Sequence, residues 1–496
     1  MQKIAAISLL TLLACACTSL RKKEVEFFIL QLNDVYEIAP LEGGKVGGLA
    51  RVATVLDSLK DLNPNTISLL AGDFISPSLI GMLNHNGEEI AGKQMIETLN
   101  AIGLDYVTFG NHEFDVKEPE VQARIDESEF TWIASNTLHK VDGISRPWTR
   151  KGKALQNFEI EVFTNTLGDT VKVGLMGITG DFNQKEYVHY LNDYVNVGKQ
   201  LLQDYREEYD VSVAITHLEI AQDTVFAGAL QEIPLILGGH DHVHMHVPVG
   251  ESVVTKADAN AKTIYIHRCI YDVSSQTLNV ESTLMPINDQ IVAHPKVDKE
   301  VKRWTQIAEQ SMKDMGYDPQ DVIYRANAPL DGREKSIRYE PTNLGALIAQ
   351  SLYASRNKLD FAIFNSGSVR LDDQLMGDIT QTDVLRTLPF GGPLVITQMK
   401  GDQVRQMLNI GLYQNRGIGG YFQTYKIGLQ EHTFTINDEP LDNEYIYTFI
   451  APKFLMDGKE SNLGFLGRFK YDEPEQFAGG VRNDIRDVFI DYLSQQ

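Results

Sequence analysis

The sequence is poor in cysteine, and beyond its first residues it has no apolar segment long enough to span a membrane. Only 3 of its 496 residues are cysteine, and two of them, Cys15 and Cys17, lie in the N-terminal apolar segment. Cys269 is therefore the one thiol expected in the folded part, which excludes an internal disulfide. Apart from its N-terminus, the chain is predicted to fold outside the bilayer.

Positive charge is also scarce. The 45 Lys and Arg residues against 67 Asp and Glu residues give a net charge of −22. A chain of this charge is not expected to bind a nucleic acid polymer or an anionic lipid surface. It would also repel a small anionic substrate, unless cations in the site reversed the local field. The charge balance is thus a first indication of bound metal ions.

The N-terminal segment has the pattern of an export signal: one early Lys, an apolar run and then small residues. Its ending, Leu-Leu-Ala-Cys-Ala-Cys, resembles a bacterial lipoprotein signal, which is cut before a Cys that becomes acylated. We predict a signal peptide over residues 1–17, with lipid on Cys15 or Cys17. The mature protein is predicted to be a monomer anchored to a membrane of the cell envelope, on its periplasmic or cell-surface face.

In the first half of the chain, apolar strands alternate with amphipathic helices, which predicts layered α/β structure. The length of the chain favours two domains. We predict a first domain over residues 24–290, a connecting segment over 291–321 with one charged helix at 295–318, and a second, α+β domain over 322–496. The strands predicted in the first domain are 26–34, 66–73, 106–111, 132–136, 172–179, 211–217 and 233–242.

Most of these strands end in Asp, Asn or His. Ligands of open α/β sheets bind beyond the carboxyl ends of the strands, so these side chains are expected at one rim. Carboxylate, amide and imidazole groups suit Zn, Mn or similar divalent ions. Asp73, which follows a glycine that permits close approach, is the expected bridge between two ions. The candidate ligands are Asp34, Asp73, Asn111, His217, His240 and His242.

This ordered series resembles the calcineurin-like metallophosphoesterases, in particular the 5′-nucleotidase and UDP-sugar hydrolase family. The resemblance covers essentially the whole mature chain. It implies a four-layer α/β/β/α sandwich followed by a substrate-binding domain. It also implies that Asp34, Asp73 and His242 hold one ion, and that Asp73, Asn111, His217 and His240 hold the other.

The resemblance gives His112 a role other than metal binding. It would stabilise the phosphoryl group and the leaving oxygen, with Asp115 as its hydrogen-bond partner. The physical reasoning agrees, because metal ions lower the pKa of a bound water towards neutrality. A protonated His112 held by a carboxylate could then donate to the departing oxygen.

The first motif of the chain departs from the family pattern. The family has Asp-x-His, whereas Tyr36 stands here in place of the His. A phenol has a pKa of about 10, so it binds a metal well only when the metal removes its proton. Three alternatives are open: Tyr36 ligates as a phenolate, Glu37 or a nearby His takes the place, or a water fills the gap at a loosely held ion. We favour a retained but altered site, because Asp34, Asp73 and His242 remain.

Several segments of the second half resemble the substrate-binding loops of the same family. Residues 365–370 resemble its Asn-Gly-Gly-x-Ile-Arg loop, whose Arg can bind an anionic oxygen at two points. Glu340 stands where a second Arg is expected. Tyr421 and Phe454 stand where the family clamps a base between two aromatic rings, although both could equally be core residues. The predicted substrate-binding residues are Arg338, Asn365, Arg370, Tyr421, Phe454 and Glu460.

The leading hypothesis is hydrolysis of phosphate monoesters, above all nucleoside 5′-phosphates, by a water activated at two divalent metal ions. The same ions would serve hydrolysis of a UDP-sugar pyrophosphate or of a 2′,3′-cyclic phosphodiester. Tyr36 and Glu340 leave open a third alternative, a surface protein that binds nucleotides without turnover.

Overall fold

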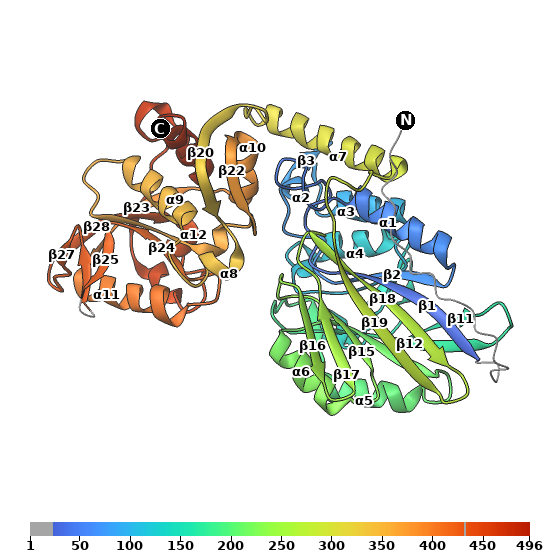
Figure 1. Cartoon of the computed structure of the whole chain (residues 1–496). Helices are drawn as coiled ribbons and strands as arrows, with labels where there is room; N and C mark the ends of the chain where they lie inside the picture. The colour runs from blue at the N-terminus through green and yellow to red at the C-terminus, as the bar shows by residue number, and fades with distance from the viewer. Residues whose placement is uncertain (1–22, 431–432) are drawn as a thin grey trace, which may run out of the picture.

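The computed structural model describes residues 23–430 and 433–496. The predicted signal peptide and the lipid on Cys15 or Cys17 lie outside these residues and stay predictions. No helix within the described residues is both long and apolar enough to cross a membrane. Figure 1 shows two bodies of mixed α/β structure joined by one long helix, α7 (Pro295–Asp314).

Two six-stranded sheets face each other in the first domain. Fully buried side chains of both sheets, such as Phe27, Leu69, Val173 and Val213, fill the space between them. Strands covered on both faces are expected to be almost continuously apolar, as the inner strands at 66–71, 211–217 and 235–238 are. In order across the sheets, the strands are β19 (Thr277–Pro286), β18 (Thr263–Asp272), β1 (Glu24–Leu32), β2 (Thr66–Ala71), β5 (Tyr106–Thr108) and β6 (Thr131–Trp132), and then β11 (Glu159–Thr164), β12 (Thr170–Thr179), β14 (Val211–His217), β15 (Leu235–Gly238), β17 (Ser252–Lys256) and β16 (Met245–Val249).

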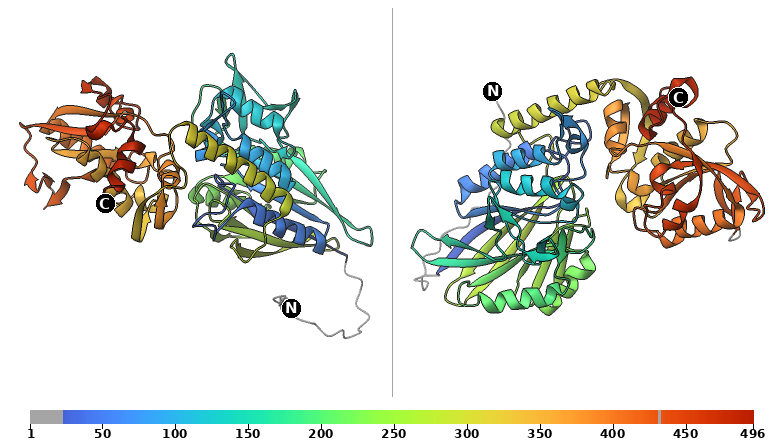
Figure 2. Two further views of the ribbon diagram at one scale, coloured as in Figure 1. Left: turned by 90° about the horizontal axis from the view of Figure 1, so that it is seen from above. Right: turned by 180° about the vertical axis from the view of Figure 1, so that it is seen from behind.

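Helices cover the outer face of each sheet, so the layers run helices, sheet, sheet, helices (Figure 1). The connecting helix α7 packs across two helices of the first layer, as the view from above in Figure 2 shows. This arrangement confirms the predicted four-layer sandwich. The helices of the two outer layers are α1 (Leu49–Leu62), α3 (Lys93–Ile102), α4 (Glu118–Glu127) and α7, and then α5 (Tyr194–Asp204) and α6 (Ile220–Ala229).

Several elements are shorter than the sequence predicted. The strands expected at 66–73, 106–111 and 233–242 are the shorter β2, β5 and β15. The helix expected at 295–318 ends at Asp314, because Gly316 has a φ of 89°, the left-handed conformation that commonly ends helices. The strand expected at 132–136 is reduced to β6. Asn136 instead bonds through its side chain to both backbone groups of Thr179 in the opposite sheet. That side-chain contact ties the two sheets together next to the strand ends.

The second domain is built on a five-stranded sheet with an apolar cluster on each face, which confirms the predicted α+β domain. Its strands, in order, are β24 (Phe422–Tyr425), β21 (Phe361–Asn365), β28 (Ile446–Pro452), β23 (Leu394–Lys400) and β29 (Tyr471–Asp472). A separate pair is formed by β20 (Val322–Asp331) and β22 (Gln374–Thr380), and the helices are α8 (Glu334–Ile337), α9 (Asn343–Ala354), α10 (Gln381–Thr387), α11 (Gly401–Asn409), α12 (Lys453–Met456) and α13 (Ile485–Leu493).

Candidate metal centre

The polar residues beyond the strand ends of the first domain converge on one place. Strands β1, β2 and β5 run parallel in one sheet, as β14 and β15 do in the other. Asp34, Asp73, His240 and His242, which follow these strands, all have φ between 53° and 81°. Such left-handed backbone costs about 1–3 kcal/mol at a non-glycine residue and clusters at functional sites. The sharp turns bring side chains of both sheets together.

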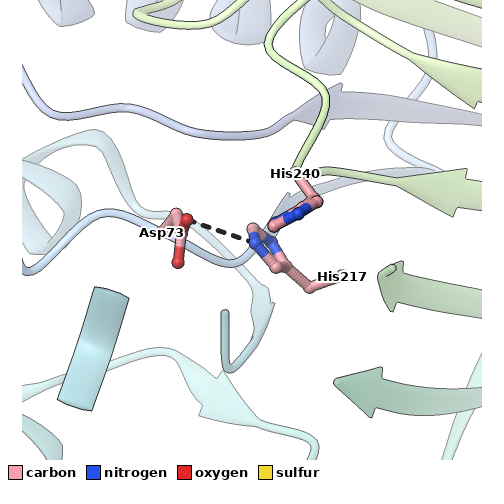
Figure 3. A group of neighbouring side chains, drawn as sticks. All are labelled: Asp73, His217 and His240. Carbon is pink, nitrogen blue, oxygen red and sulfur yellow. Dashed lines mark ion pairs between the residues drawn. The ribbon is translucent and has the colours of Figure 1, made fainter. Parts of the chain in front are cut away.

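Two groups of potential metal ligands share the carboxylate of Asp73. In each group the ligand atoms lie within 4.8 Å of one another. Figure 3 shows the first group, with the Asp73 carboxylate directed at the His217 ring and His240 entering from the neighbouring loop. The groups are Asp73, His217 and His240 in one and Asp34, Asp73 and His242 in the other.

The hydrogen-bonding pattern of the first group is that of a cation site. The Nδ1 atom of His217 lies 2.8 Å from the carbonyl oxygen of Ala71, so Nδ1 donates there and Nε2 is the nitrogen directed at the other ligands. His217 Nε2 lies 3.2 Å from Asp73 Oδ2 and 3.2 Å from Asn111 Oδ1. The same Asn111 oxygen lies 3.1 Å from His240 Nδ1. Imidazole nitrogens, a carboxylate and an amide oxygen that converge in this way are ligands that divalent ions prefer, so the residues fit a bound metal.

Hydrogen bonds orient the carboxylate of Asp34 within the second group. Its Oδ2 atom accepts from the Asn33 side chain at 2.8 Å and from the His240 backbone N–H at 2.9 Å. The other oxygen, Oδ1, lies 3.5 Å from His242 Nε2. Oδ1 also accepts from the His240 N–H, at 3.2 Å, so these bonds fix the carboxylate with Oδ1 facing His242.

The phenol of Tyr36 lies among the ligand atoms of the second group. Its hydroxyl donates to Asp73 Oδ2 at 3.1 Å and lies 3.1 Å from His242 Nε2. Glu37 lies elsewhere, with a carboxylate oxygen 3.7 Å from Arg386 Nε of the second domain. Of these two residues, Tyr36 is therefore the one placed to complete the group.

Glu113 organises the centre, a role that the sequence analysis missed. This fully buried carboxylate accepts from the backbone N–H groups of Asp73, Phe74, Ile75 and Gly110 at 2.5–3.1 Å. Burial raises the pKa of Glu113 to about 7, and the charge of Asp73 adds to this effect. A Cβ on Gly110 would lie 2.1 Å from Asp73 Oδ1, so only glycine fits there. The one sequence signal for Glu113 was its place directly after Asn111 and His112.

His112 and Asp115 form a hydrogen-bonded pair at the edge of the centre. His112 Nδ1 lies 2.6 Å from Asp115 Oδ2, and the His112 backbone N–H donates to Asp73 Oδ1 at 2.7 Å. Asn183 donates to the other Asp115 oxygen at 2.8 Å. Burial works against a charged His112 ring, but Asp115 and Asp73 outweigh it and raise its pKa. The charge of Arg370, across the domain boundary, acts in the opposite direction.

The two predicted phosphate-binding arginines differ in their surroundings. Arg338 forms an ion pair with Glu334 one helical turn away. Arg370 has a buried Nε atom with no hydrogen-bond partner among the described residues, and its guanidinium lies 5.5 Å from the Phe390 ring centre. An unpartnered buried donor is costly, so Arg370, unlike Arg338, has a donor that still lacks a partner.

The other predicted substrate-binding residues lie around the end of β21. Asn365 is buried there and donates to Glu460 Oε2 at 2.9 Å. Tyr421 is only 5% exposed, whereas Phe454 is 46% exposed. Phe454 thus offers an open ring face, and Tyr421 is largely a core residue in this arrangement of the domains.

A cavity of about 600 Å³ lies between the two domains. Its walls include His240, His242 and Lys262 from the first domain and Arg338 and Asp372 from the second. The two domains together therefore enclose space for a small molecule next to the candidate ligands.

A buried lysine supports the loops that carry two of the histidines. Lys256 is fully buried, and its ammonium donates to the carbonyl oxygens of Leu218 at 2.6 Å and Gly239 at 2.7 Å. Leu218 directly follows His217, and Gly239 directly precedes His240. The ammonium also pairs with Asp223 at 2.7 Å and with Asp241. Although burial opposes the charge, the two carboxylates raise the pKa of Lys256.

Replacing Lys256 with Met is expected to lower the free energy of unfolding by about 3–5 kcal/mol, because Asp223 would be left buried without its counter-charge. Urea denaturation measures the change. Lys302→Met is the matched control: Lys302 pairs with Asp298 at the surface and has a 69% exposed side chain. It is expected to cost at most about 1 kcal/mol. Equal losses in the two variants would refute a supporting role for Lys256.

Comparison with known proteins gives consistent matches to both halves of the chain. Residues 28–244 match the family model of the calcineurin-like phosphoesterases, and residues 322–465 match that of the 5′-nucleotidase C-terminal domain. The chain is 24% identical over 548 residues to the 5′-nucleotidase of Bos taurus, covering 94% of this chain and 89% of that protein. It is 26% identical over 432 residues to the trifunctional nucleotide phosphoesterase protein YfkN of Bacillus subtilis (strain 168), covering 79% of this chain and 28% of that protein.

The fold is similar to that of the 5′-nucleotidase precursor from Thermus thermophilus. The TM-score is 0.75 at 20% identity, and the match covers 95% of this chain and 96% of that one. The likeness therefore extends over both domains.

Proposed function

Because the chain belongs to the family that joins a calcineurin-like phosphoesterase domain to a 5′-nucleotidase C-terminal domain, we propose that it hydrolyses phosphate monoesters, above all nucleoside 5′-phosphates. The observation that carries this proposal is the pair of ligand groups sharing Asp73, with His112 beside them and the unpartnered Arg370 on the facing domain. This combination provides for a metal, a proton donor and an anion-binding group.

The two ligand groups would hold two divalent ions, Zn, Mn or similar. When bound, such ions make water a stronger acid and neutralise negative charge on a phosphoryl group. The protein's own contribution is the arrangement of the ligands, which share Asp73. Tyr36 is proposed to occupy the place of the family's histidine. The proposed ligands are Asp34, Tyr36, Asp73 and His242 for one ion, and Asp73, Asn111, His217 and His240 for the other.

His112 would supply the proton that the leaving oxygen needs. Asp115 occupies its Nδ1 atom, so Nε2 is the nitrogen available to donate. The bond from the His112 backbone to Asp73 holds this residue beside the carboxylate that the two ligand groups share. Proton transfer by a positioned side chain typically contributes a factor of about 10²–10⁴ in rate.

The second domain would hold the substrate from the opposite side. Arg370 is proposed to bind the phosphoryl oxygens, and the exposed ring of Phe454 to stack on a base; the unpartnered Nε of Arg370 and the exposure of Phe454 support these roles. The bonded pair of Asn365 and Glu460 presents polar atoms that suit the hydroxyl groups of a ribose. These residues support a nucleoside phosphate over a simpler phosphate ester.

The proposal is tested by phosphate release from a panel of phosphorylated metabolites, with purified protein supplied with Mn²⁺ or Zn²⁺ and its metal content measured. Nucleoside 5′-monophosphates are expected to be the best substrates. UDP-sugars and 2′,3′-cyclic nucleotides belong in the panel, because product analysis separates the three hydrolytic reactions. No phosphate released by protein that contains metal would refute the proposal.

Two variants separate recognition of the base from recognition of the phosphate. Phe454→Ala is expected to raise KM about tenfold for a nucleoside monophosphate, since stacking on a base contributes about 1–3 kcal/mol. It should leave KM for glycerol phosphate unchanged. Arg370→Ala is expected to raise KM for both substrates by about 10–100-fold, the equivalent of one charged hydrogen bond. An unchanged nucleotide KM in Phe454→Ala would contradict base stacking on this ring.

A further inference from the structure

One residue of the second domain reaches into the candidate metal centre of the first. Asp372 Oδ2 lies 2.9 Å from Nδ1 of His242. Contacts from both domains hold it there: Asp372 Oδ1 accepts from the Glu334 backbone N–H at 3.0 Å, and its backbone carbonyl accepts from Lys262 Nζ at 2.9 Å. Its φ of 43° is left-handed, as at the ligands themselves. The contact is therefore built into a sharp turn and is not an incidental surface approach.

The chemical meaning of this contact follows from how histidines bind metals. A ligand imidazole almost always donates its second N–H to a carboxylate, a carbonyl or a water, which fixes the orientation of the ring and strengthens it as a ligand. His217 has such a partner, the Ala71 carbonyl, in its own domain. His242 has Asp372, and the two residues belong to different domains.

No residue of the first domain substitutes for Asp372. Among the hydrogen bonds of the described residues, Nδ1 of His242 has no partner in its own domain. The nearest alternative carboxylate, Glu334, is also in the second domain, 3.8 Å away, and is paired with Arg338. If the second domain moved away, the His242 ring would lose the group that orients it.

The position of Asp372 in the chain links this contact to the substrate. Arg370, the proposed phosphate-binding residue, lies two residues earlier in the same turn. Arg370 lies close enough to His112 for its charge to influence that ring, while Asp372 contacts His242. One turn of the second domain thus approaches both sides of the centre.

We propose that Asp372 is a positioning residue that makes binding of the ion on Asp34 and His242 depend on docking of the second domain. The proposal rests on the two-ion site of the proposed function. Coupling between two equilibria is reciprocal, so this ion in turn stabilises the docked arrangement of the domains. The other ion, on Asn111, His217 and His240, has no such contact and is expected to bind independently of it.

The test measures the affinity of each ion by competition with a chelator. In Asp372→Ala, one of the two ions is expected to bind about 10–100-fold more weakly, the usual effect of removing such a partner. The other ion should keep its affinity. Asp372→Asn retains an acceptor oxygen without the charge, so an intermediate loss is expected. Asp378→Ala, which removes an exposed carboxylate paired with Arg325, is the control and should leave both affinities unchanged.

A second measurement tests whether ion binding is coupled to domain docking, or whether the substitution only removes the bond that orients His242. Small-angle scattering of the full protein with and without chelator reports the arrangement of the domains. Wild type is expected to become more extended when metal is removed. Asp372→Ala should show the same scattering in both conditions. If the scattering of wild type were the same with and without metal, the proposed coupling would be wrong.

The outcomes also separate this inference from the proposed function. If wild type binds two ions and Asp372→Ala binds both with equal affinity, the role of Asp372 is wrong and the hydrolase proposal stands. If wild type binds no ion under conditions that preserve its fold, both proposals fail.

Discussion

Asp73→Asn is expected to retain neither ion and to lose phosphate-releasing activity. Asp73 belongs to both ligand groups and contributes the only carboxylate of the group with His217 and His240. Each bound ion contributes several kcal/mol of charge stabilisation in the transition state. Since about 1.4 kcal/mol is a factor of ten, the expected loss is on the order of 10³-fold or more.

Asn is chosen because it preserves shape. Its remaining carbonyl oxygen can still accept from the His112 backbone N–H, so the loop should keep its course. Metal content after desalting and kcat are measured on the same preparation. Asp105→Asn is the control, because that carboxylate also accepts from a backbone N–H, that of Ser68, but lies in neither ligand group. Two ions retained by Asp73→Asn would exclude Asp73 as the bridge.

The sequence predicts much of this centre because the signals are local. Apolar runs that end in Asp73, Asn111 or His217 mark strands and their carboxyl ends without knowledge of the fold. Parallel strands place such ends at one edge, so convergence within each sheet can be inferred. The division of these strands between two facing sheets followed from the family resemblance and not from any local pattern.

The supporting residues could not be predicted in the same way. Glu113 bonds to a loop about 40 residues away, and Lys256 joins two loops that only the packing of β14, β15 and β17 brings together. A buried Lys or Glu has no periodic signature. The contact between Asp372 and His242 spans 130 residues and depends on the placement of two domains. Only tertiary structure contains that information.

Tyr36 shows a different limit of prediction from sequence, the direction of a side chain. The sequence identified the position as unusual and left three alternatives open. The choice depended on which side chain turns inward, and the side-chain contacts place the phenol among the ligand atoms and Glu37 beside Arg386. Backbone pattern alone does not determine such directions at an irregular loop.

His112→Asn is expected to lower kcat for a nucleoside 5′-monophosphate by about 10²–10⁴-fold, the range typical of a lost proton donor. The variant removes the ring that Asp115 orients through Nδ1 but keeps the backbone N–H that bonds to Asp73. Metal content should therefore stay at the wild-type level. A variant that also lost its ions would show a structural defect, and metal analysis of the same preparation detects it.

The dependence on the leaving group is the sharper part of this prediction. The 5′ oxygen of a nucleoside is a poor leaving group and needs a proton as it departs, whereas p-nitrophenolate leaves readily without one. His112→Asn should thus lose far less activity on p-nitrophenyl phosphate than on a nucleotide. Asp115→Asn, which removes the charge that favours protonated His112, should show the same selectivity with a smaller loss. Equal losses on both substrates would mean that His112 stabilises the phosphoryl group and does not donate the proton, because that contact is needed whichever group departs.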